Sequence, residues 1–208
     1  MDGTPSPHEA HWESVHAAKG AGEVSWWQEP DSLWLDLIER AGASPADPVV
    51  DVGAGASLLV DALLDAGFSD VTVLDISAAA LDRVARRLGA RAAGVRLVAA
   101  DVTEFRGDRP YALWHDRAVF HFLTDPADRD AYRASLRANV APGGLAVLAV
   151  FAPDGPETCS GLPVRRYDVQ GLVDEIGAGF ALVHAERRVH TTPWGSEQPF
   201  TVALLRRA

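Results

Sequence analysis

The sequence has 208 residues, and its 29 acidic residues outnumber its 19 lysines and arginines, for a formal net charge of −10 at pH 7. With 48% hydrophobic and 23% charged residues, this length predicts one globular domain and excludes a disordered or fibrous protein. The negative charge disfavours nucleic acids and anionic membranes as partners, because both would repel it.

The sequence favours a cytoplasmic protein. Its single cysteine, Cys159, excludes an intrachain disulfide and a zinc site built from cysteines, as is typical of a reducing compartment. Residues 1–7 lack the basic and apolar segments of a signal peptide. The sequence also lacks an uncharged apolar run of about 18 residues, the length that predicts a transmembrane helix.

The first 30 residues are predicted to form a tail or lid ahead of the main domain, which we place at residues 31–208. A Pro/Ser/Gly-rich stretch covers residues 1–7, and a short helix is expected between His8 and Gly20, where glycines end it. Apolar residues at helical spacing then predict an amphipathic helix from Asp31 to Ala41.

From residue 48 onward, apolar runs bounded by turn residues alternate with amphipathic segments. Such runs are typical of buried parallel strands, and the segments between them are typical of helices. Repeated β-α-β units of this length predict an open parallel sheet with right-handed crossovers. The predicted strands are Pro48–Val52, Val71–Ile76, Val95–Ala100, Tyr111–His115 and Leu145–Phe151, and the predicted helices are Ser57–Ala66, Ser77–Leu88 and Pro126–Asn139.

The last third of the chain has a different pattern. A short helix is expected at Val169–Ile176, and it is followed by two extended runs, Phe180–His190 and Phe200–Leu205. A Pro/Gly-containing turn at Pro193–Ser196 lies between them. Two extended runs joined by such a turn predict an antiparallel pair that closes one edge of the sheet.

The most informative motif is the glycine-rich run Asp51–Ser57, which lies between an apolar strand and a helix. Glycines let the backbone approach a ligand closely, and the helix that follows presents unpaired N–H groups. In an open α/β sheet this position is the ligand crevice. Leu58 occupies the third glycine position of a dinucleotide fingerprint, which disfavours NAD and FAD, and no Gly-Lys-Ser/Thr of a phosphate-binding loop follows.

Two further acidic residues end the next two predicted strands. Asp75 follows the second strand, near the ~20-residue separation from Asp51 at which a carboxylate reaches ribose hydroxyl groups. A carboxylate suits a diol because it accepts two hydrogen bonds at once. Asp101 follows the third strand, where an acid can meet an adenine amino group while its neighbour Val102 packs against the ring. One such acid is often a helix cap, but three in succession point to a nucleoside ligand.

This combination resembles the class I S-adenosylmethionine-dependent methyltransferase family, and the resemblance covers residues 31–206. The acid-x-Gly-x-Gly-x-Gly motif of the family has Ser57 at its third glycine, a position that tolerates a small residue. Three flanking segments are similar to a subgroup of small bacterial-type methyltransferases. The family motifs lie at Asp51–Gly55, Asp75, Asp101–Val102 and Pro142–Gly144, the last a turn before the fifth strand, and the subgroup segments lie at Glu23–Gln28, Trp114–Phe122 and Phe151–Pro156.

The resemblance implies an α/β, Rossmann-like fold with a mostly parallel seven-stranded sheet and a C-terminal antiparallel strand. It implies S-adenosylmethionine as the cofactor, with Gly53 and Gly55 at its methionine part, Asp75 at its ribose and Asp101 at its adenine. No metal is expected, because the N-terminal histidines are poorly spaced for one. The further implied cofactor contacts are Trp27, Gln28, Asp51, Ile76, Val102 and His115.

In this family the acceptor lies near the end of the fourth strand. His115 or Asp116 is the candidate general base or orienting group, because an imidazole titrates near neutral pH. The alternative is that Asp116 binds backbone N–H groups and that His115 only contacts the cofactor. Arg117 and His121 are candidate acceptor contacts, although a salt bridge and core packing, respectively, explain them as well.

Cys159 and Arg165, in the segment after the fifth strand, are further candidate acceptor contacts, and the alternative for Cys159 is an unused thiol. Near the N-terminus, the aromatic faces of Trp26 and Trp27 can stabilise a sulfonium cation, and Gln28 can hydrogen-bond the methionine carboxylate. The alternative for the two tryptophans is a core or lid position without cofactor contact.

We therefore predict a methyltransferase that acts on an N, O or S nucleophile of a small molecule, because the core fold leaves no separate substrate-recognition domain. A protein lysine methyltransferase is one alternative, since the acidic charge would attract a basic target. A non-catalytic S-adenosylmethionine binder is another. An NAD-dependent oxidoreductase is disfavoured by the missing third glycine.

Overall fold

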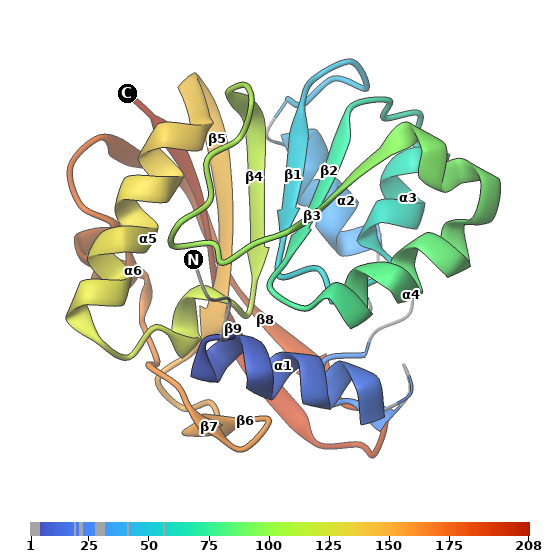
Figure 1. The fold of residues 1–208 in the computed structure, drawn as a ribbon. Helices are drawn as coiled ribbons and strands as arrows, with labels where there is room; N and C mark the ends of the chain where they lie inside the picture. Colours follow the sequence, from blue (N-terminus) through green and yellow to red (C-terminus); the bar gives the residue numbers. More distant parts are fainter. Residues whose placement is uncertain (1–4, 19, 21–22, 28–31, 41, 56) are drawn as a thin grey trace.

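A seven-stranded sheet forms the centre of the computed structural model, which describes the chain apart from residues 1–4, 19, 21–22, 28–31, 41 and 56 (Figure 1). The strand order is β3-β2-β1-β4-β5-β9-β8, with parallel pairing throughout except at β5–β9 and β9–β8. A short ribbon pairs β6 with β7. The strands are β1 (Val49–Val52), β2 (Val71–Asp75), β3 (Val95–Ala99), β4 (Tyr111–Arg117), β5 (Val140–Phe151), β6 (Thr158–Cys159), β7 (Leu162–Pro163), β8 (Phe180–Thr191) and β9 (Glu197–Arg207).

Helices cover both faces of the sheet, and each face has its own hydrophobic core. Val49 and Leu113 belong to the core with α2, α3 and α4, whereas their neighbours Val50 and Trp114 belong to the core with α5 and α6. Successive side chains of a strand point to opposite faces, so a strand covered on both sides is apolar throughout. The helices are α1 (Pro7–Ala18), α2 (Ser32–Arg40), α3 (Leu59–Asp65), α4 (Ala78–Leu88), α5 (Pro126–Asn139) and α6 (Val169–Ile176).

The predicted fold class is confirmed, and several element boundaries differ, most of all the start of β5. The segment Pro142–Gly144, expected as a turn between helix and strand, lies within β5, which follows α5 directly. Tyr111 pairs with Val140 but Leu113 pairs with Leu145, so the register of β4 with β5 shifts there. The turn residues are therefore accommodated as an irregularity inside the strand rather than before it.

Helix α1 crosses the carboxyl ends of the central strands (Figure 1). Its Glu13 accepts a hydrogen bond from the hydroxyl of Ser77, which follows β2, and its Trp12 packs edge to face on Phe122, which follows β4. In open α/β sheets ligands bind at this edge. Helix α1 therefore covers the side of the sheet where a ligand is expected. Among the helices that the structure describes, none has the length and apolar character needed to cross a membrane.

Candidate active site

A cavity of about 190 Å³ lies at the carboxyl ends of β1, β2 and β4, beneath helix α1. Most residues that the sequence predicted as cofactor contacts line it, although they come from distant parts of the chain. These residues are Trp27, Asp51, Gly53, Gly55, Asp75, Ile76, Asp101, Val102 and His115. Gln28, the remaining predicted contact, lies outside the described residues.

The glycine-rich loop turns sharply because its two glycines adopt left-handed backbone conformations. Gly53 has φ +60° and Gly55 has φ +51°, and the Gly53 amide donates to the carbonyl of Leu74 at 2.7 Å. A Cβ atom on Gly53 would lie 2.0 Å from Cγ2 of Val119. Both the backbone angle and the close neighbour require glycine at position 53.

We expect Gly53→Ala to lower the free energy of unfolding by about 2–4 kcal/mol, from backbone strain together with the clash with Val119. Urea denaturation measures the change. Gly67→Ala is the matched control, because Gly67 has φ +88° but open space around its Cα. In a Val119→Ala background the cost of Gly53→Ala is expected to fall to that of Gly67→Ala, and an unchanged cost would refute the clash.

Asp75 ties the glycine-rich loop to the end of β2. Its Oδ2 accepts from the Gly55 amide at 2.7 Å, and its Oδ1 accepts from the Ser77 amide at 2.8 Å. Burial raises the pKa of this carboxyl to about 6; the two amide donors oppose that shift, and the nearby Asp51 and Glu13 carboxylates reinforce it. Because a carboxylate has about four acceptor positions, Asp75 keeps acceptor capacity for a ligand in the cavity.

Asp101 lies one strand further along the same edge of the sheet. Its Oδ1 accepts from the Thr103 amide at 2.8 Å and from the Thr103 hydroxyl at 2.7 Å, which fixes the carboxylate after β3. Ile76 and Val102 line the cavity beside it. The ends of β2 and β3 thus place two carboxylates and two apolar side chains around one part of the cavity.

The alternation of side chains along β4 directs the two candidate catalytic residues to opposite faces of the sheet. His115 and Arg117 point to the cavity, whereas Asp116 points to the opposite face, where it is fully buried. There Asp116 accepts from the Tyr132 hydroxyl at 2.5 Å and from the Val119 amide at 3.0 Å. Burial raises the pKa of Asp116 to about 6, against the effect of these donors. Asp116 therefore shapes the turn after β4 and does not line the cavity.

His115 pairs with Asp51 across β1 and β4. The distance from His115 Nδ1 to Asp51 Oδ1 is 2.7 Å, and each side chain is only 3% exposed. The two residues are direct partners in the parallel register of these strands. The cavity therefore holds an imidazole that is fixed by a buried carboxylate.

The predicted acceptor contacts do not all come together. Arg117 and Cys159 line the cavity, and burial raises the pKa of the Cys159 thiol. His121 is fully buried outside it: its Nδ1 accepts from the Phe151 amide at 3.3 Å, and burial lowers its pKa to about 3.

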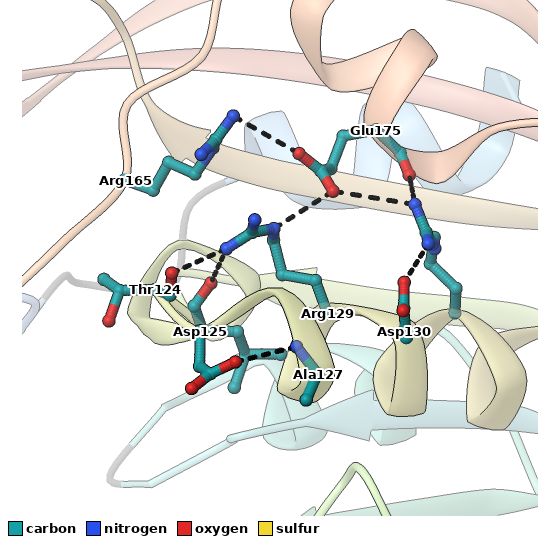
Figure 2. Close-up of polar contacts among 9 residues, drawn as sticks. Thr124, Asp125, Ala127, Arg129, Asp130, Arg165 and Glu175 are labelled. Atoms are coloured by element: carbon teal, nitrogen blue, oxygen red, sulfur yellow. Dashed lines mark hydrogen bonds and ion pairs between the residues drawn. The ribbon is translucent and has the colours of Figure 1, made fainter.

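Arg165 also lies away from the cavity lining. Its guanidinium lies 3.4 Å from a carboxylate oxygen of Glu175, which also binds Arg129 at 3.0 Å (Figure 2). Arg129 in turn donates to the carbonyl of Thr124 at 2.7 Å. This network joins the start of α5 to the end of α6, which gives Arg165 a structural partner.

Sequence reasoning did not identify several cavity residues from segments that meet only in the fold. Trp12 packs on Phe122 with a ring-centroid distance of 5.0 Å and on Trp26 at 5.7 Å. The His16 ring lies beside Gly55, and burial lowers its pKa to about 4. The i, i+4 spacing of Trp12 and His16 on a helix was an available signal for a shared face. Further cavity residues that were not predicted include His8, Val119, Leu123 and Asp128.

The cavity fits an adenosine-containing sulfonium compound. Asp75 and Asp101 offer acceptors for hydroxyl and amino donors, Gly53 allows close approach of the backbone, and aromatic rings wall the remaining space. Asp51 Oδ2, buried in the cavity wall, accepts no hydrogen bond from any residue that the structure describes. Across the described ranges, no group of three or more His, Cys, Asp or Glu side chains could hold a metal ion.

Residues 49–144 match a family model described as methyltransferase domain. The Burkholderia thailandensis 1,6-didemethyltoxoflavin-N1-methyltransferase, solved with 1,6-didemethyltoxoflavin and S-adenosylhomocysteine, aligns with a TM-score of 0.70 and 22% identity over 100% of this chain and 92% of that one. The matched segment, just under half of the chain, is thus similar to a methyltransferase domain, and the solved structure shares its fold.

Two further proteins are similar to this chain. A structure described as the conversion of a disulfide bond into a thioacetal group during echinomycin biosynthesis has a TM-score of 0.76 and 18% identity, over 96% of this chain and 92% of that one. The mouse eEF1A lysine and N-terminal methyltransferase is 26% identical over 123 residues, which are 58% of this chain but only 16% of the mouse protein. The structural likeness shows the fold, and the acceptor must be argued from the site.

Proposed function

We propose that the protein transfers the methyl group of S-adenosylmethionine to an N, O or S nucleophile of a small molecule. The observation that carries this proposal is the covered cavity: α1 lies over it, and Trp12, Trp26, Phe122 and Cys159 wall it. The whole cavity, which would hold both cofactor and acceptor, measures about 190 Å³. A compact acceptor fits such a space better than a folded protein surface does.

The cavity residues divide into two proposed groups. Asp75 binds the ribose hydroxyls, Asp101 with Val102 binds the adenine, and the loop of Gly53 holds the methionine part. His115 and Arg117 face the acceptor, because the alternation of β4 directs both into the cavity. S-adenosylmethionine supplies an electrophilic methyl group, whose carbon bonds to the nucleophile while the carbon–sulfur electron pair stays on sulfur.

A cell extract and methyl-labelled S-adenosylmethionine test the proposal. After incubation with the protein, the extract is separated into low-mass and macromolecular fractions. Label in the low-mass fraction is the expected result, and mass spectrometry then identifies the product. No label in any fraction, with cofactor binding measured by calorimetry, would contradict the proposal and favour a binding protein.

Protein lysine methylation is a second candidate, favoured by the match to part of the mouse methyltransferase and by the net charge of −10, which would attract a basic target. It predicts label in the protein fraction of the same experiment. A lysine side chain would have to enter the cavity that Trp12 and Phe122 line.

Glu13 fastens α1 over the cofactor site. Its Oε2 accepts from the Ser77 hydroxyl at 2.6 Å and from the Ala79 amide at 3.2 Å, at the start of α4. The Ser77 hydroxyl, together with the Ala79 amide, lowers the pKa of Glu13. The anion also interacts favourably with the positive end of the α4 dipole.

We expect Glu13→Ala to raise the dissociation constant of S-adenosylmethionine about threefold to tenfold, since it removes a charge-assisted contact of the helix that covers the cavity. Calorimetry gives the affinity, and hydrogen exchange of residues 7–18 reports the release of α1. Glu9→Ala is the control on the same helix, because Glu9 bonds only to nearby Ser6 among the contacts described. Equal affinities for both variants would refute this role of Glu13.

A further inference from the structure

We propose that Asp51 is the positioning residue for His115, and that the two act as a proton-accepting dyad. The inference deepens the proposed function and rests on it for the reaction. It gives Asp51, in the glycine-rich motif, a second task besides lining the cofactor site. The geometry of β1 and β4, rather than the motif, is what carries this assignment.

The dyad is built into the register of the sheet. Val50 pairs with Trp114 and Asp51 with His115, so the Asp51 and His115 side chains stand side by side on the same face. Their 2.7 Å contact is nearly inaccessible to water, with 3% of each side chain exposed. A contact between two strand residues in the centre of a sheet has little freedom to rearrange.

The contact determines which ring nitrogen carries the proton. An ionised carboxylate only accepts hydrogen bonds, so His115 Nδ1 must donate to Asp51 Oδ1. In a neutral imidazole with a protonated Nδ1, the other nitrogen, Nε2, is the acceptor. His115 lines the cavity, and its Nε2 is buried in the cavity wall. We infer that Asp51 makes this nitrogen the proton acceptor for a nucleophile bound in the cavity.

The proton balance of the step follows from this tautomer. A nucleophile X–H transfers its proton to Nε2 of His115 as the electron pair of X forms the bond to the methyl carbon. The imidazole becomes an imidazolium with both nitrogens protonated, and its positive charge lies beside the Asp51 carboxylate. Release of the Nε2 proton to water then restores the neutral ring.

Nitrogen NMR of the His115 ring tests the dyad without requiring turnover. The wild-type protein, loaded with S-adenosylhomocysteine, is expected to show the Nδ1–H tautomer, with the His115→Asn spectrum used for assignment. In Asp51→Ala we expect a mixture of the two tautomers. An Nε2–H tautomer in the wild type, or an unchanged tautomer in Asp51→Ala, would overturn the proposal.

A kinetic measurement separates positioning from cofactor binding. With the extract fraction that accepts label, Asp51→Asn is expected to slow methyl transfer at saturating cofactor by about 10²–10⁴-fold. We expect cofactor affinity to change by less than about tenfold. A loss of cofactor affinity that fully explains the slower transfer would overturn the dyad. Absence of label with the wild-type protein would instead refute the proposed function. The NMR measurement would still decide the tautomer of His115 in that case.

The chain offers a matched control in a second imidazole–carboxylate pair. His184 Nε2 lies 3.1 Å from Glu186 Oε2 on β8, away from the cavity lining. Glu186→Gln breaks this pair while leaving β1 and β4 intact. It is expected to leave the His115 tautomer and the rate of methyl transfer unchanged, and a change in either would show that the Asp51 effect is not local.

Discussion

Replacing His115 by asparagine is expected to lower the rate of methyl transfer by about 10²–10⁴-fold, the range for loss of a general base. Asparagine keeps a polar side chain on β4 but has no group that accepts a proton near neutral pH. The ring nitrogen bonded to Asp51 would also be lost, which leaves a buried carboxylate without its 2.7 Å partner. Single-turnover measurements at saturating S-adenosylmethionine isolate the transfer step from binding.

The His115 experiment needs a control for general effects on the sheet. His184→Asn removes an imidazole from β8, at a site that is partly exposed and does not line the cavity. This variant is expected to transfer methyl groups at the wild-type rate. A His115→Asn protein that also retains the wild-type rate would exclude a general base at this position and favour a nucleophile that reacts without deprotonation.

The opposite orientations of His115 and Asp116 on β4 could be predicted from the sequence. Strand periodicity alone places alternate residues on opposite faces, so His115 and Asp116 had to point in different directions once both lay in one strand. Ending the predicted strand at His115 concealed this, because a residue after a strand has no fixed face. The structure extends β4 to Arg117, and the alternation then brings Arg117 to the cavity with His115.

The glycine-rich loop and the acids that follow the strands were predictable because they are local. Asp51, Asp75 and Asp101 each end or precede a turn at the same edge of a parallel sheet, and topology alone brings such positions together. The pairing of Asp51 with His115 was not predictable, because it depends on the register between two strands that are separated by 64 positions in the sequence. Periodicity within a strand carries no information about that register.

The cover formed by α1 depends on contacts that the sequence pattern does not encode. Glu13 reaches Ser77 across 64 positions, and Trp12 meets Phe122 across an even longer separation. The sequence indicated a helix in this region but left its docking open. Helix α1 has few apolar residues, and it is held by aromatic packing and by the Glu13 carboxylate, which binds the start of α4. Hydrophobic spacing alone therefore did not predict where α1 docks.

Replacing Asp75 by alanine is expected to weaken S-adenosylmethionine binding by about 1.5–3 kcal/mol, equivalent to a ten- to 150-fold rise in the dissociation constant. The variant loses the proposed ribose acceptor and leaves the Gly55 and Ser77 amides without their buried partner. Calorimetry well below the melting temperature measures the affinity.

Asp168→Ala is the matched control for the Asp75 variant, because it also deletes a carboxylate that accepts from a backbone amide, that of Gly171 at 2.7 Å. Asp168 is the N-cap of α6, so its removal is expected to lower the free energy of unfolding by about 1 kcal/mol. It does not line the cavity, so cofactor affinity should stay at the wild-type value. An Asp75→Ala protein that binds as tightly as this control would refute the ribose assignment.

The pH dependence of binding gives a second signature of Asp75. Its pKa of about 6 means that the free protein holds a proton on this carboxyl below pH 6. Ribose hydroxyls that donate to Asp75 favour the ionised form, so the complex binds fewer protons than the free protein. Wild-type affinity is therefore expected to be constant above about pH 6 and to fall below it. Asp75→Asn has no titrating group at this position, so its affinity for S-adenosylmethionine should stay constant through the same pH range. A fall below pH 6 in this variant would show that another group causes the dependence.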